Sequence, residues 1–304
     1  MTTLLPDTLL VLERDWLSSN NILSVEGDSA TLIDSGYVSQ ASQTVTLVER
    51  ALGGRRLKRL INTHSHSDHI GGNAAVQAAF GCSVTIPEGI EATIAGWDEE
   101  ALLLGPLGQQ AARFTHDTTY AAGDQFELGG LNWHAISVPG HDMAALALYS
   151  PERRLLISGD ALWENGFGVI FTELLGNNDG LKSTRETLEM LARLPIDVVI
   201  PGHGTIFGAV DQAFERSFRR LVGFEKNIDT LARHALKVVF IFIMLEKRRL
   251  RRTELPEFLT ALSFAQTVNN RILCLDIEQL AEWLVRDLCR AGALREEDGW
   301  LIAS

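Results

Sequence analysis

Cysteine and long apolar runs are both scarce in this chain of 304 residues. The three cysteines, Cys82, Cys274 and Cys289, show no CxxC spacing and leave an odd count, which indicates reduced thiols in a reducing compartment. The first residues lack a basic region followed by a continuous apolar segment, so no signal peptide is predicted. The longest apolar run, Val238–Leu245, is far shorter than the roughly 20 residues that cross a bilayer. We therefore expect a soluble, cytoplasmic protein without membrane contacts.

Positive charge is also in short supply. The chain has 27 lysines and arginines against 39 acidic residues, a formal net charge of −12, which disfavours broad binding to nucleic acids or anionic membranes. A glycine-rich phosphate loop, a dinucleotide-binding fingerprint and the helical zinc-protease pattern His-Glu-x-x-His are absent. A hydrophobic content of 46% supports a substantial core, and the length allows one large domain with a smaller one.

What the chain does contain is a dense cluster of metal-ligand residue types. His64-x-His66-x-Asp68-His69 places three histidines and an aspartate within six positions, between an apolar strand and a helix of small residues. Neutral imidazoles suit zinc, iron or manganese, and the carboxylate adds charge that favours a second divalent ion. The cluster therefore predicts half of a two-metal site, since side chains packed this tightly would otherwise repel or desolvate one another.

The same kind of residue recurs where apolar strands are expected to end. Four such stretches lead into Pro, Gly or other small residues that present a histidine or an aspartate: Leu57–Ile61 before His64, Asn132–Val138 before His141, Leu155–Ser158 before Asp160, and Val198–Ile200 before His203. Taken singly, His141 and His203 could cap turns and Asp160 could cap a helix. Together with the first cluster, these strand ends are expected to converge at one rim.

The remaining pattern predicts an α/β architecture. Antiparallel strands are expected over Leu9–Leu12, Ile22–Val25 and Ala30–Ile33, with a hairpin turn at Glu26-Gly27-Asp28. A helix is expected over Gln40–Leu52, and residues 87–122 read as a helical excursion or lid rather than sheet. Asp34 ends a strand, where it could cap a turn or support the histidine loop from behind.

The motif His64-x-His66-x-Asp68-His69, followed by His141, Asp160 and His203, resembles the metallo-β-lactamase-fold hydrolase superfamily. The resemblance implies a four-layer αββα sandwich with a mainly helical C-terminal extension. It assigns His64, His66 and His141 to a first metal ion, and Asp68, His69 and His203 to a second, with Asp160 bridging the two. The cofactors would be two divalent ions, zinc in the first place, with iron and manganese open.

The chemistry expected from this centre is hydrolysis. Two cations lower the pKa of a shared water, so that a bridging hydroxide attacks a small ester, thioester or lactone, with Asp68 orienting it as the catalytic residue. Flavin-linked di-iron relatives typically carry glutamate where this chain has His66, and they add a flavodoxin-like domain that is absent here. A mononuclear-iron sulfur dioxygenase remains an alternative.

The apolar stretch after Asp160 is the first candidate for a substrate pocket. Trp163, Phe167 and Phe171 could line it, and core packing is the alternative for each. Glyoxalase-II-type thioesterases resemble the chain in the metal motifs, but their basic glutathione-binding pattern is not evident. A glutathione thioester is therefore one candidate among several small molecules.

The C-terminal part, residues 211–304, has a different character from the metal-binding part, residues 1–210. Helical patterns over Gln212–Leu231 and Ala232–Glu246 are followed by three more helices and a terminal hairpin. This order resembles the winged-helix extension of the β-lactamase-like-protein-2 type, some members of which cleave RNA. The run Lys247–Arg252 could bind nucleic acid, although a solvated helix face fits the net charge better.

Three roles for this region stay open: covering the metal cleft, forming a homodimer contact, or binding RNA. The hydrolase prediction accordingly has two alternatives, a metal-dependent endoribonuclease and a metal-bearing binding or regulatory protein with an occluded cleft.

Overall fold

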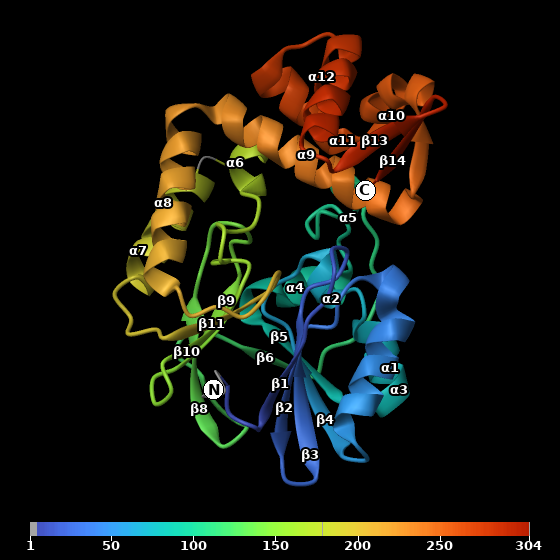
Figure 1. Cartoon of the computed structure of the whole chain (residues 1–304). Helices are drawn as coiled ribbons and strands as arrows, with labels where there is room; N and C mark the ends of the chain where they lie inside the picture. Colours follow the sequence, from blue (N-terminus) through green and yellow to red (C-terminus); the bar gives the residue numbers. More distant parts are fainter. Residues whose placement is uncertain (1–4, 178, 304) are drawn as a thin grey trace.

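Two sheets packed face to face form the centre of the computed structural model, which describes residues 5–177 and 179–303 (Figure 1). The first sheet runs in the order β1 (Leu9–Leu12), β2 (Asn21–Glu26), β3 (Ser29–Ile33), β4 (Arg56–Ile61), β5 (Ser83–Pro87) and β6 (Thr118–Tyr120). The second runs in the order β11 (Val198–Pro201), β10 (Leu155–Gly159), β9 (Leu146–Ser150), β8 (Leu131–Ser137) and β7 (Gln125–Leu128). The predicted N-terminal hairpin is confirmed, because β2 pairs antiparallel with both β1 and β3.

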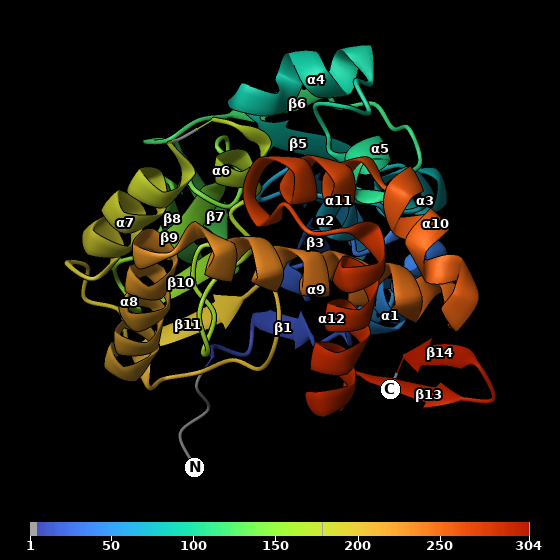
Figure 2. The ribbon, with the colours of Figure 1, turned by 90° about the horizontal axis from the view of Figure 1, so that it is seen from above.

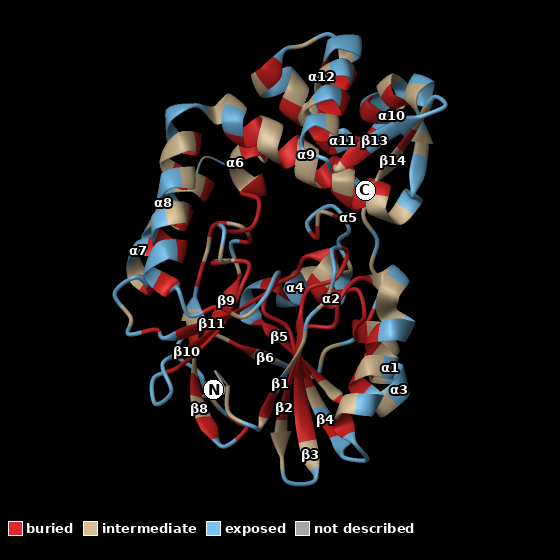
Figure 3. Cartoon of the chain, in the orientation of Figure 1, coloured by how far each residue is buried: buried red, intermediate tan, exposed pale blue. Residues whose placement is uncertain are grey.

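The core between the sheets consists of alternate residues from both inner faces. Ile33 and Ile61 of the first sheet belong to the same buried cluster as Ile157 and Ile200 of the second. Trp133 on β8 is fully buried there, and its indole Nε1–H donates to the carbonyl oxygen of Leu128 at 3.1 Å. Most residues of the strands are coloured as buried in Figure 3, except near the β2–β3 turn.

Helices cover the outer face of each sheet and complete the four layers. The first sheet is covered by α1 (Ala41–Leu52), α3 (Asn73–Phe80) and α4 (Glu91–Gly96), which share one buried cluster with it. The second sheet packs against α7 (Gly180–Leu191) and α8 (Val210–Lys226). The predicted αββα sandwich is therefore confirmed.

Short helices lie in the loops at the rim of the sandwich. They are α2 (Ser67–Ile70), α5 (Leu104–Leu107) and α6 (Phe171–Leu175). Within residues 87–122 the expected helical turns are present, but the segment also contributes β6, so the expectation that it adds no sheet was wrong. This strand of three residues pairs parallel with β5, where the hydroxyl groups of Thr85 and Thr118 lie 2.8 Å apart.

The C-terminal part is mainly helical, as expected. After α9 (Ile228–Lys247) come β12 (Arg249–Arg251), α10 (Leu255–Ala261), α11 (Ser263–Val268) with a following π-helical turn, α12 (Ile277–Arg290), β13 (Leu294–Glu297) and β14 (Trp300–Ala303). The small sheet has the order β12-β14-β13, so the first strand pairs with the last, as in a winged helix. Seen from above, α9 crosses the molecule between α8 and this sheet (Figure 2).

Two details of this region differ from the sequence pattern. The break between the first two helices lies at Asn227 and not at Leu231, because the Asn227 side chain caps α9 by accepting from the Asp229 amide at 3.0 Å. The basic run Lys247–Arg252 is not a single helix face: Lys247 ends α9, and Arg249–Arg251 form β12. Residues two apart on a strand share a face, so Arg249 and Arg251 both lie over the Trp300 ring, at 4.4 and 4.2 Å.

The division of the chain near residue 210 remains a proposal. The helix α8 starts at Val210, yet one hydrophobic cluster extends from the outer face of the second sheet through α8 and α9 into α12. We propose that the two parts fold as one cooperative unit. No helix in the part of the chain that the structure describes is long and apolar enough to span a membrane.

Replacing Phe264 with alanine tests this cooperativity. Phe264 on α11 is fully buried, and its ring lies 5.6 Å from that of Phe171 in the sandwich. We expect Phe264→Ala to lower the free energy of unfolding by about 3–5 kcal/mol while urea denaturation keeps a single transition. Leu10→Ala, at a side chain that is 44% exposed, is the control and should cost under about 1 kcal/mol. Two separate transitions would contradict the proposal.

Candidate metal centre

Seven side chains with metal-binding donor atoms meet at the rim to which the strand ends lead. They form two groups, His64 with His66 and His141, and Asp68 with His69, Asp160 and His203. Within each group the donor atoms lie within 4.8 Å of one another. The structure thus brings together all seven residues that the sequence singled out.

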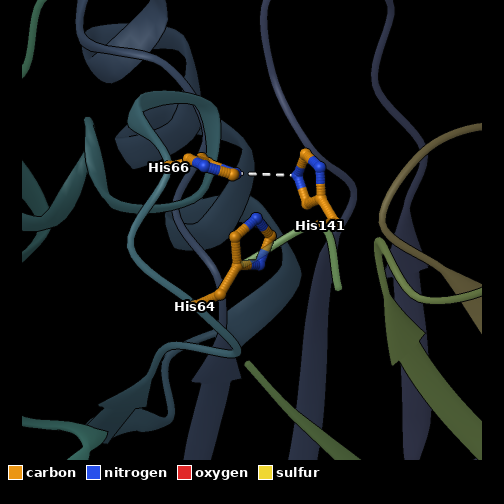
Figure 4. Close-up of side chains that lie close together, drawn as sticks. All are labelled: His64, His66 and His141. Carbon is orange, nitrogen blue, oxygen red and sulfur yellow. Dashed lines mark hydrogen bonds between the residues drawn. The ribbon is translucent and has the colours of Figure 1, made fainter. Parts of the chain in front are cut away.

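The first group consists of three imidazoles that point toward a common centre (Figure 4). Nδ1 of His66 and Nε2 of His141 lie 2.7 Å apart. Nε2 of His64 is buried and has no hydrogen-bond partner among the described residues. A buried nitrogen without a partner is costly, and a cation between the three rings would satisfy it.

The second group combines two carboxylates with two imidazoles. Nε2 of His203 lies 2.9 Å from Oδ2 of Asp68. Nε2 of His69 is fully buried and, like that of His64, makes no hydrogen bond to any described residue. Each group therefore contains one orphaned imidazole nitrogen, and the donor set fits a divalent metal in both places.

Asp160 lies between the two groups. Its Oδ1 is 3.4 Å from Nε2 of His69, whereas its Oδ2 is 3.3 Å from Nε2 of His141 and 3.8 Å from that of His203. The backbone of Gly202 approaches so closely that a Cβ atom there would overlap Oδ1. The one carboxylate thus faces both groups, which is the placement expected of a bridging ligand.

Hydrogen bonds behind the imidazoles fix which nitrogen faces inward. Nδ1 of His69 donates to Oδ2 of Asp34 at 2.8 Å, and Nδ1 of His141 donates to the carbonyl oxygen of Val169 at 2.5 Å. Asp34 also accepts from the backbone amide and hydroxyl of Thr63, at 2.9 and 2.7 Å. Asp34 thereby holds both His69 and the start of the histidine loop, the supporting role considered from the sequence.

Burial and close charges set the protonation of the centre. Burial and the neighbouring His141 lower the pKa of His66 to about 4, so this imidazole is neutral and able to bind a metal at neutral pH. Burial acts to raise the pKa of Asp68, but His69 and His203 outweigh it and lower that pKa to about 2. Burial likewise opposes ionisation of Asp160, yet His203 and His69 keep its pKa well below the ordinary value. Both carboxylates are therefore ionised at neutral pH.

A narrow cleft opens from the centre between the sandwich and α9. Trp163 and Phe171 line it, as expected from the sequence. Phe167 is not among the described side chains of the cleft; it is 3% exposed and packs in the core, with its ring 6.3 Å from that of Phe224. Phe167 is therefore a core residue, which was the alternative considered from the sequence.

Several cleft residues were missed from the sequence. Trp16 stacks on the His203 ring at 4.9 Å although 52% of its surface is exposed, and Val238 and Phe242 of α9 form the opposite wall. Asp142 accepts from both the amide and the hydroxyl of Ser65, at 3.1 and 2.7 Å, which holds the histidine loop. Asp142 could have been suspected from the sequence, because it directly follows His141. Trp16, Val238 and Phe242 could not, because they reach the cleft only through the packing of distant segments.

The pattern of residues 14–203 matches the family model described as the metallo-beta-lactamase superfamily. The chain belongs to the metallo-beta-lactamase superfamily. The match covers strands β2 to β11 and every residue of both donor groups, whereas β1 and α8 lie outside it.

The chain is also similar in sequence and in fold to known proteins. A hydroxyacylglutathione hydrolase of Brucella ovis is 30% identical over 156 residues, which cover 50% of this chain and 51% of that protein. The chain thus spans about half the length of the curated relatives that it matches. A solved metallo-beta-lactamase family protein from Thermus thermophilus shares the fold, with a TM-score of 0.55, 20% identity and coverage of 97% and 98% of the two chains. A class B3 di-zinc metallo-beta-lactamase from an Alaskan soil metagenome gives a TM-score of 0.51, with 20% identity and coverage of 64% and 75%.

The role of Asp34 can be tested by replacing it with asparagine, which keeps the shape but removes the charge that faces His69. We expect Asp34→Asn to weaken metal affinity roughly 10- to 100-fold, measured by competition with a chromogenic chelator. Asp28→Asn, in the exposed β2–β3 turn, is the matched control and should leave affinity unchanged. Equal affinity of the two variants would contradict the supporting role.

Proposed function

We propose that this protein is a dinuclear metal-dependent hydrolase of small esters, thioesters or lactones. The observation that carries the proposal is the pair of donor groups with Asp160 between them and one orphaned imidazole nitrogen in each. His64, His66 and His141 would hold one ion, Asp68, His69 and His203 the other, and Asp160 both. Zinc is the leading candidate, since imidazole and carboxylate ligands suit it, and iron or manganese would also be accepted.

When bound, two such ions lower the pKa of a water molecule between them and polarise the oxygen of a scissile carbonyl. The residues of the chain position the reactants. The ionised Asp68 carboxylate, on the cleft side of the second group, accepts a hydrogen bond from the attacking water and orients it toward the substrate. The apolar walls formed by Phe171, Val238 and Phe242 limit access of further water.

The shape of the cleft supports a small substrate that enters from one side. The space directly at the metal centre is about 50 Å³, and it adjoins a wider hollow of about 450 Å³ through Trp16, Trp163 and His203, which line both. The rings of Trp16 and Trp163 offer apolar contacts to an acyl or lactone group, while charged side chains such as Arg14 and Glu164 line the rest of the wider hollow. The likeness to a hydroxyacylglutathione hydrolase supports a thioester among these classes.

An endoribonuclease is the second candidate, and the winged-helix topology of the C-terminal sheet favours it. Against it, Arg249 and Arg251 lie on Trp300, and Arg252 lies 4.0 Å from Glu296. Part of the basic run is therefore engaged within the protein.

Replacing Asp160 tests the two-metal assignment. We expect Asp160→Ala to lose at least one of two bound ions, because both groups lose a ligand, and to reduce hydrolysis at least roughly 100-fold; metal content is measured by mass spectrometry after gel filtration. Asp197→Ala is the control, since Asp197 pairs with Arg154 at 3.3 Å on the surface. Full occupancy of two sites in Asp160→Ala would refute the bridging role.

A substrate panel separates the candidate functions. Metal-loaded protein is incubated with a thioester, an aryl ester, an acyl homoserine lactone, a β-lactam and single-stranded RNA. The proposal predicts turnover of one of the first three and none of RNA. RNA cleavage alone would favour the nuclease, and no turnover of any compound would favour a binding or regulatory role.

A further inference from the structure

A second hollow, apart from the metal centre, lies in the corner between α8 and α9. It has a volume of about 460 Å³, and its charged lining consists of Arg219, Arg220, Arg233 and Lys237 with one carboxylate, Asp287. The chain as a whole carries a net charge of −12, so four cations around one hollow run against its composition. Such a concentration of positive charge attracts an anion.

Most of these cations are not neutralised within the protein. Across residues 5–177 and 179–303, Arg219, Arg220 and Arg233 take part in no ion pair, and Lys237 has one, at 3.5 Å from Asp287. The guanidinium of Arg233 lies 4.6 Å above the Trp283 ring, a contact that fixes its position without using its N–H groups.

Few of the donors in this corner are used internally. Arg220 donates one hydrogen bond from Nη1 to the carbonyl oxygen of Asn165, at 3.3 Å. A guanidinium has five N–H groups, and this bond uses one of them, while the group packs against the backbone of Gly166. The corner therefore offers hydrogen-bond donors as well as charge to a ligand.

The imidazole of His234 lies close to the same cations. It lies in the hollow, stacked on Phe224 with ring centroids 5.7 Å apart. Burial, Arg220 and Lys237 together lower the pKa of His234 to about 3. This side chain is thus neutral, and it adds a polar but uncharged wall.

The hollow and the metal cleft each share lining residues with one groove along α9. Lys237 also lines an apolar groove of about 260 Å³ between α9, α12 and Trp16. Trp16, Val238 and Phe242 in turn line both that groove and the metal cleft. Arg233 and Phe242 lie roughly 13 Å apart along the helix axis, at about 1.5 Å per residue. A single extended molecule could therefore reach from the cations to the metal centre.

We propose that the basic hollow binds the phosphate groups of the substrate's leaving thiol. This proposal rests on the hydrolase function and narrows its substrate to a thioester whose thiol is joined by a neutral arm to a phosphorylated nucleoside. Water adds to the thioester carbonyl carbon and the carbon–sulfur bond breaks, which yields a carboxylate, a free thiol and a proton. The apolar groove along α9 holds the arm, while the cations hold the phosphates.

Binding is tested first, independently of catalysis. Titration calorimetry of the metal-loaded protein with adenosine diphosphate at low salt should show one site, and Arg219→Gln/Arg233→Gln should weaken it roughly tenfold, since two charge-assisted contacts are lost. Lys58→Gln, an exposed cation on β4, is the matched control and should bind as the wild type does. Adenosine diphosphate binding that is equal in all three proteins, as at the metal ions alone, would overturn the proposal.

Kinetics with one acyl group on two carriers test the substrate itself. Butyryl-coenzyme A carries phosphates, whereas butyryl-N-acetylcysteamine has the same thioester without them. Wild type and Lys58→Gln should show a KM at least roughly tenfold lower for the coenzyme A thioester, a preference that falls as sodium chloride rises. In Arg219→Gln/Arg233→Gln the ratio of the two KM values should approach one.

The outcomes separate this proposal from the function on which it rests. Hydrolysis of both thioesters with equal KM in wild type would overturn the carrier proposal and leave the hydrolase standing. Hydrolysis of neither, with arginine-dependent binding of adenosine diphosphate retained, would overturn the hydrolase. Tighter, arginine-dependent binding of single-stranded RNA than of coenzyme A would refute the small carrier in favour of a nucleic acid.

Discussion

The buried Asp160 carboxylate between two groups of imidazoles is the interaction on which the rest of the structure depends. Among the described residues it receives no hydrogen bond from a backbone amide; its polar neighbours are the indole N–H of Trp163 at 3.2 Å and the histidines of both groups. Removing an ionised carboxylate from water is costly unless opposite charge compensates it. Nε2 of His64 and Nε2 of His69, both buried, also make no hydrogen bond to any described residue. Cations bound here would compensate the charge of the Asp160 carboxylate and would also give the two imidazole nitrogens a partner.

The fold supplies this arrangement through the ends of its strands. β4, β8, β10 and β11 belong to two different sheets, yet their terminal loops deliver donors to one rim because the sheets pack face to face. The support behind the donors is equally distributed: Asp34 at the end of β3 holds His69, and Asp142 holds the loop at Ser65. The helix α9, from the C-terminal part of the chain, then forms one wall of the cleft with Val238 and Phe242. The site is thus a product of the whole chain rather than of one motif.

Local signals in the sequence predicted an α/β architecture and singled out all seven donor residues, whereas the four-layer sandwich was implied by the resemblance to a known family. Apolar strands ending in glycine or proline mark the strand-to-loop transitions, and histidine and aspartate at those points are chemically distinctive. Features that depend on packing between distant segments were not visible. Trp16 gives no sign in the sequence that it will stack on His203, and Phe167 has the same local appearance as Phe171 although it faces the core. The strand β12 was hidden because its alternate arginines pack on a tryptophan near the other end of the C-terminal part.

Two glycines pack directly against two of the side chains that would bind metal. The backbone of Gly202 lies directly against Asp160, and that of Gly168 lies against the ring of His141, with no room for a Cβ atom at either position. The backbone therefore fills the space directly beside the Asp160 carboxylate and the His141 ring. Zinc, with bonds of about 2.0–2.2 Å to nitrogen and oxygen, suits these imidazole and carboxylate donors, whereas calcium, which needs about 2.3–2.6 Å and roughly six or more oxygens, does not. If these side chains hold the proposed ions, the main chain at Gly202 and Gly168 limits how far Asp160 and His141 can move away from them.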